Sequence, residues 1–150
     1  MNRNKLLYRI TKAIVDIMFY GGILCTLAVP FVLPDLIKTI GYKAEMLIPH
    51  TIILMLSGAL AVYILFLLRQ MFKTVIKGKP FVKKNISCLA RCGLSAMLIS
   101  AIFVVKVILW PTITAVIIAV TFALLGIFCL TLRDVFECAV AYKEENDFTI

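Results

Sequence analysis

The sequence predicts an all-α, polytopic membrane protein with four transmembrane helices in an antiparallel bundle and both termini in the cytoplasm. Four apolar stretches support this prediction, at residues 13–33, 48–68, 92–110 and 113–132. Each is close to the ~20 helical residues that cross a bilayer core of ~30 Å. Hydrophobic residues make up 63% of the chain, whereas a soluble domain is usually about half apolar. We expect one domain, because few residues remain outside the stretches.

Positive charge predicts the orientation. Of the 16 Lys and Arg residues, 13 belong to the N-terminal tail, to the connection 69–91 or to the segment 133–150. Only Lys38, Lys43 and Lys106 fall on the other side. Basic residues near the ends of spans stay in the cytoplasm, so both termini and the connection 69–91 are predicted to be cytoplasmic.

The first stretch is too long for the apolar region of a cleaved signal peptide, and we expect it to be retained. Pro30 and Pro34 near its outer end predict that the helix stops there. Asp16 is the only carboxylate inside a predicted span. A charge in this setting raises the possibility of a proton or cation pathway. Lys12, four residues earlier, favours the simpler interpretation of an ion pair near the inner surface.

The connection 69–91 contains two basic amphipathic segments. The first continues the second span by two to three helical turns, and Gly78 is placed to end it. Pro80 begins the second segment. Clusters of Lys and Arg beside a membrane attract anionic headgroups at ~1 kcal/mol per residue. Membrane lipids are therefore predicted partners, and direct nucleic-acid binding is much less favoured.

The last two spans are joined only by Trp110, Pro111 and Thr112, which predicts a tight helical hairpin. Trp110 suits the outer interface, and Lys106 is expected to extend to it. Small residues spaced by four recur in every span and let helices approach closely in lipid. The longest such ridge, in the fourth span, could instead form a homo-oligomer face.

The fourth span continues as an amphipathic helix into residues 133–150, which end in an acidic tail. The tail alternates acidic and apolar residues. We expect it to fold back as a latch beside the basic connection, with Glu145 or Asp147 paired to Arg91 or Lys84. Phe148 would then bury against the helix ends.

The sequence contains no recognisable catalytic or metal-binding motif. Five cysteines and one histidine offer no metal-binding spacing, and no disulfide framework is expected. No nucleophile, base and orienting group can be assembled from the motifs. We therefore expect neither enzymatic activity nor a cofactor or metal, and no small-molecule substrate is indicated.

Two motifs resemble a family of bacterial four-span membrane proteins catalogued as domain of unknown function 2975. One is Gly78-Lys79-Pro80-Phe81 followed by Asn85, Leu89, Arg91 and Gly93, and the other is the terminal Glu-x-Asp-x-Thr-Ile. Val82 departs from the pattern, because members often carry a Ser or Thr that could cap the next helix. The resemblance implies the bacterial cytoplasmic membrane, no enzymatic activity, and a genetic association with a very small helix-turn-helix regulator.

The favoured hypothesis is a non-enzymatic interaction module whose cytoplasmic face engages a partner such as that regulator. The residues predicted to form this face are Gly78, Pro80, Phe81, Asn85, Arg91, Glu145, Asp147 and Phe148. Two alternatives are a small oligomeric transporter or channel component, and an immunity protein against a membrane-active peptide.

Overall fold

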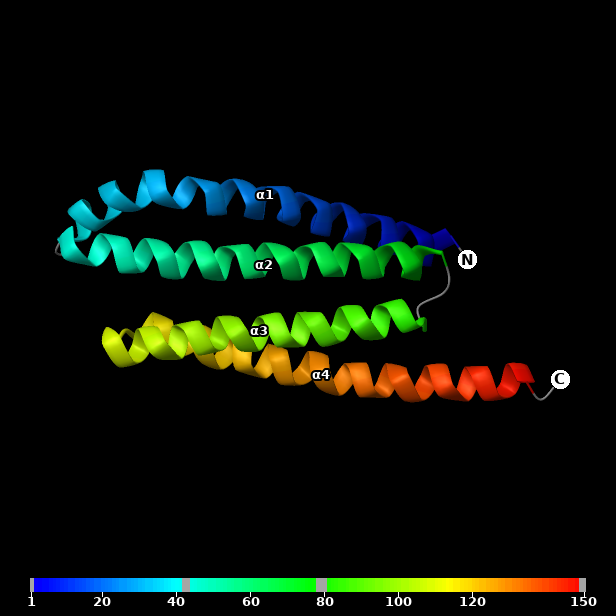
Figure 1. Cartoon of the computed structure of the whole chain (residues 1–150). Helices are drawn as coiled ribbons and strands as arrows, with labels where there is room; N and C mark the ends of the chain where they lie inside the picture. Colours follow the sequence, from blue (N-terminus) through cyan, green and yellow to red (C-terminus); the bar gives the residue numbers. More distant parts are fainter. Residues whose placement is uncertain (1, 42–43, 78–80, 149–150) are drawn as a thin grey trace.

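The computed structural model describes residues 2–41, 44–77 and 81–148, and all regular structure in this part is helical. The elements are α1 (Asn2–Ile40), the short 3₁₀ helix η1 (Ala44–Met46), α2 (Leu47–Ile76), α3 (Lys83–Leu109) and α4 (Ile113–Phe148). Figure 1 shows the four long helices side by side, with the start of α1 and the end of α4 at the same end of the molecule. We call this the terminal end, and the opposite end the hairpin end.

All four long helices are sufficiently long and apolar to cross a membrane. Their outer faces carry large apolar side chains that a soluble protein would bury. Ile17, Phe31 and Ile113, for example, are 72%, 79% and 82% exposed. Extensive exposed apolar surface marks contact with lipid or with another protein. The protein is therefore a multi-pass membrane protein, as the sequence predicted.

The helices form a series of neighbours, in which α3 and α4 share the largest interface, α1 packs on α2, and α2 packs on α3 (Figure 1). The core lies between α3 and α4, with α2 covering it. Its buried residues are Ile99, Phe103, Ala115 and Ala119. A second cluster nearer the terminal end joins α2 and α3 through Leu67, Cys88 and Cys92.

Small residues allow α3 and α4 to approach closely. A Cβ on Gly93 would come within 3.1 Å of the Gly126 carbonyl oxygen, and a Cβ on Gly126 would come equally close to the Gly93 oxygen. The Ser100 hydroxyl also donates to the Ala119 carbonyl, at 2.8 Å. Ala115 and Ala119, two members of the fourth-span ridge, are thus buried within the chain. Small residues do pack these helices, as expected.

The expected end of the first helix is wrong. Pro30 and Pro34 both lie inside α1, which continues to Ile40 and bends in its last third (Figure 1). A bend costs less than a full break here, because free backbone groups at membrane depth find no water to bind. Gly41 ends the helix region with a φ of +79°, a left-handed conformation that glycine adopts without strain.

Candidate functional site

The candidate site lies at the terminal end, where the end of α2, the start of α3 and the last turns of α4 meet. The sequence predicted amphipathic extensions of the second and fourth spans, and both are helical: α2 continues to Ile76 and α4 to Phe148. Gly78 and Pro80, which were expected to shape this face, lie outside the described residues.

Phe81 precedes α3 and contacts α4. Its ring lies 5.0 Å from that of Phe136, centroid to centroid, with the planes tilted by 48°. Phe81 is nevertheless 44% exposed. It therefore covers one side of α4 and is not fully wedged between helices.

Asn85 is fully buried and joins α2 to α3. The Thr74 hydroxyl, near the end of α2, lies 2.9 Å from Asn85 Oδ1 and 2.7 Å from the Met71 carbonyl oxygen. A buried amide needs such partners, because a lost hydrogen bond in the interior costs ~1–3 kcal/mol. Asn85 thus fixes the geometry of this end and is not itself a docking surface. Arg91, one and a half turns later, is exposed.

Val82 is the N-cap residue of α3, with extended backbone angles and no side-chain capping bond. Its carbonyl accepts from the Asn85 amide, at 2.9 Å. With valine at this position in place of Ser or Thr, the start of α3 is capped by backbone hydrogen bonds and not by a side chain.

The acidic segment does not fold back. Residues 144–148 continue α4 as a straight helix, which follows a run 139–145 in which Ala, Lys and Glu, all good helix formers, fill five of seven positions. Glu144 Oε1 contacts Lys83 Nζ at 2.8 Å, so an acidic residue of α4 does pair with the basic connection. This pair joins Lys83 to Glu144; the expected pairing of Glu145 or Asp147 with Arg91 or Lys84 stays a prediction. Glu145 is exposed, and the side chains of Asp147 and Phe148 lie outside the described part.

A groove of about 580 Å³ separates the start of α3 from the last turns of α4. Its lining mixes charged and small residues: Lys83, Ile86, Ser87, Ala90, Arg133, Glu137, Val140, Ala141 and Glu144. The Lys83–Glu144 pair crosses between the two helices at one end of the groove.

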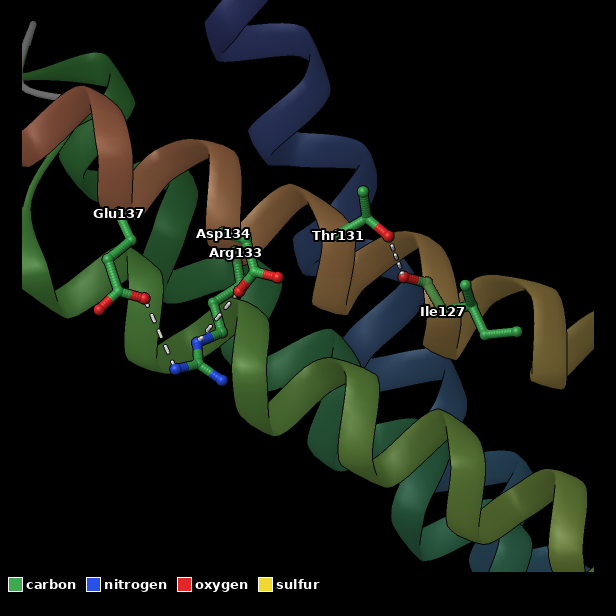
Figure 2. A network of polar contacts seen from close by, with 5 residues as sticks. All are labelled: Ile127, Thr131, Arg133, Asp134 and Glu137. Atoms are coloured by element: carbon green, nitrogen blue, oxygen red, sulfur yellow. Dashed lines mark hydrogen bonds and ion pairs between the residues drawn. The ribbon is translucent and has the colours of Figure 1, made fainter.

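Arg133 marks the other end of the groove, nearer the middle of α4. Figure 2 shows its guanidinium between the carboxylates of Asp134 and Glu137, with N–O distances of 3.9 and 3.5 Å. Two residues before Arg133, the Thr131 hydroxyl donates to the Ile127 carbonyl within the helix (Figure 2). All three charged side chains are 42% or more exposed, so these ion pairs are weak and exchangeable. The sequence predicted an amphipathic helix in this segment but gave no sign of the groove.

Asp16 lies apart from this groove, on the α1–α2 interface. Its Oδ1 lies 2.6 Å from Arg69 Nε, and both atoms are buried. The expected partner, Lys12, is therefore wrong. Arg69 takes this position because α1 and α2 pack side by side and two aromatic rings hold the guanidinium. Its central carbon lies 5.4 Å from the ring centroids of both Phe19 and Tyr20.

The family described as "Protein of unknown function (DUF2975)" matches residues 35–150, which include the end of α1 and all of α2, α3 and α4. The chain belongs to the DUF2975 family. No curated protein and no solved structure matches it. The DUF2975 match covers every residue of the terminal groove, whereas Asp16 precedes it.

Proposed function

We propose that this DUF2975 protein is a non-enzymatic interaction module of the bacterial cytoplasmic membrane. Its terminal end faces the cytoplasm, and the groove between α3 and α4 engages a cytosolic protein. The positive-inside distribution supports this orientation, since 13 of 16 basic residues belong to segments at that end.

The groove is the observation that carries the proposal. It combines small residues, Ala90 and Ala141, with a half-exposed charged rim. A partner can insert an anchoring side chain into such a depression while the rim provides specificity. The rim pairs contribute only ~0.2–1 kcal/mol each, so a partner can exchange them at low cost.

The favoured partner is a small helix-turn-helix regulator. Such a protein carries a basic surface for reading DNA. Asp134, Glu137 and Glu144 offer three carboxylates on the exposed side of α4, and a basic surface could displace Lys83 and Arg133 from them. Binding would then compete with DNA and hold the regulator at the membrane.

A transport role has less support. Asp16, the carboxylate that suggested an ion path, is paired with Arg69 and held beside two aromatic rings. This arrangement is what a helix-to-helix contact requires.

The test is affinity purification from a mild detergent, followed by mass spectrometry of the copurifying proteins. Ala141→Trp fills the groove, and Val135→Trp places the same indole on the opposite, 57% exposed side of α4 as a control. A small DNA-binding protein should copurify stoichiometrically with the wild type and with Val135→Trp but not with Ala141→Trp. Equal capture by all three, or no stoichiometric regulator, would contradict the proposal.

A further inference from the structure

A second cavity, of about 360 Å³, lies at the hairpin end and is separate from the terminal groove. Residues from all four long helices line it. Its polar members are His50 of α2, Lys106 of α3 and Thr114 of α4, together with Thr112 just before α4, and Leu36 and Ile40 of α1 form an apolar wall. None of these residues has a role in the proposed partner groove.

Lys106 is a cation without a carboxylate. Its Nζ lies 5.6 Å from the ring centroid of buried Phe103, one turn further from the end of α3. Helical side chains lean toward the N-terminus of their helix, which accounts for this direction and differs from the expected extension to the outer surface. In the described part of the chain, no carboxylate oxygen lies within 4.0 Å of this ammonium. Asp35, on the neighbouring α1, contacts Lys38 instead, and its side chain is 85% exposed.

A hydroxyl in the same cavity is also unsatisfied. Thr112 Oγ1 is buried and has no hydrogen-bond partner among the described residues. An unpaired hydroxyl and an unpaired ammonium are both costly away from water, and both are satisfied by an anion with several acceptor oxygens. His50 is a fixed part of the wall, because its Nδ1 lies 2.9 Å from the Met46 carbonyl and its ring lies 5.5 Å from that of Trp110.

The apolar wall continues away from the polar cavity. A further depression of about 240 Å³ runs between α1 and α2, and it shares Leu33 and Leu36 with the first. It also includes Cys25, Val32 and Leu54, and its lining is almost entirely apolar. A hydrocarbon chain would follow this track along α1 if its polar head were placed beside Lys106.

We propose that these two cavities, which share Leu33 and Leu36, bind one anionic phospholipid, with its phosphate against Lys106 and Thr112 and an acyl chain along the shared leucines toward Cys25. Charge complementarity with Lys106 favours the anion, and the apolar depression on the other side of Leu33 and Leu36 favours the chain. A free phosphate ion would use only the first part of the site.

The experiment is native mass spectrometry of the full chain in a nonionic detergent, titrated with phosphatidylglycerol or with zwitterionic phosphatidylethanolamine. The wild type should bind phosphatidylglycerol more tightly. Lys106→Met should weaken that binding at least about fivefold, the equivalent of one lysine beside a headgroup. Cys25→Trp should weaken binding of both lipids, because the indole occupies the acyl track. Lys38→Met removes an exposed lysine of the same end, whose side chain is 80% exposed, and should change nothing.

Thr112→Val is a second test of the headgroup site, and it can be used even if Lys106→Met fails to fold. Thermal melting in detergent without lipid shows which variants are folded. Equal phosphatidylglycerol affinity in the wild type and the folded headgroup variants would overturn the proposal, as would an equal loss in Lys38→Met. Displacement of the lipid by excess inorganic phosphate would identify a phosphate-ion site and would also overturn it. The capture experiment with Ala141→Trp tests the proposed function separately, so either proposal can fail while the other stands.

Discussion

Replacement of Gly126 by alanine tests the close approach of α3 and α4. The new Cβ would lie 2.7 Å from the Met97 side chain and 3.1 Å from the Gly93 carbonyl oxygen. Met97 is flexible and can move, but the Gly93 oxygen belongs to the backbone of α3 and requires the helices to separate by a few tenths of an ångström. Overpacking of this kind costs ~1–3 kcal/mol.

Alanine also favours the helix over glycine by ~0.5–1 kcal/mol, which offsets part of that cost. We therefore expect a net destabilisation of ~0–2 kcal/mol for Gly126→Ala, from the difference of these two effects. Gly21→Ala is the matched control, because a Cβ at Gly21 meets no atom within 4 Å and should bring only the helix gain. The two variants should differ by ~1–3 kcal/mol, which corresponds to roughly 2–12 °C in melting temperature.

Thermal unfolding followed by circular dichroism in one detergent provides the measurement. Gly93→Ala should resemble Gly126→Ala, and the double variant should cost less than the sum of the two, because one separation of the helices relieves both contacts. If Gly126→Ala melted at or above the temperature of Gly21→Ala, the close contact between α3 and α4 would be wrong.

Three further predictions concern the terminal end and the α1–α2 contact. Asn85→Ala should destabilise the protein by ~1–3 kcal/mol in the same melting assay, since it removes the buried hydrogen bond to Thr74. The control Asn146→Ala, at an exposed position, should stay within ~0.5 kcal/mol of the wild type. Equal melting temperatures of the two variants would contradict the role of Asn85. Phe81→Ala should cost about half of the ~3–5 kcal/mol expected for a fully buried ring, because Phe81 is 44% exposed and contacts Phe136 on one side; no change would mean that this contact does not form. Arg69→Met and Asp16→Asn should each lower the melting temperature, and the double variant should lower it by less than the sum; strict additivity would show that the two side chains do not interact.

The sequence predicted the helices far better than the contacts between them. Hydropathy located all four spans, and the 3.6-residue period correctly extended the second and fourth helices past their apolar stretches. The proline rule failed at Pro30 and Pro34, since it describes helices in water, where a broken helix can bond solvent. The sequence pattern could not show that Asp16 pairs with Arg69, which lies 53 positions later. That ion pair depends on how α1 and α2 are aligned against each other.

The candidate groove was less predictable still. The identities of Lys83, Arg133 and Glu144 were evident as charges, but their convergence requires that α3 begins at the level where α4 ends. The acidic segment was expected to fold back because acidic and apolar residues alternate in it, but α4 continues through it to Phe148. Lys106 and Thr112 were each noted near the hairpin, and only the structure shows that both line one cavity.

Orientation is the premise on which the proposed cytoplasmic interaction depends, and labelling with a membrane-impermeant thiol reagent tests it most directly. In a background with Cys25 and Cys138, the two exposed native cysteines, replaced by alanine, a single probe is introduced at Lys38 or at Asn146, both exposed. We expect Lys38→Cys to be labelled on intact bacterial cells and Asn146→Cys to react only after the membrane is permeabilised. Labelling of Asn146→Cys on intact cells would place the groove outside the cytoplasm and contradict the proposed function.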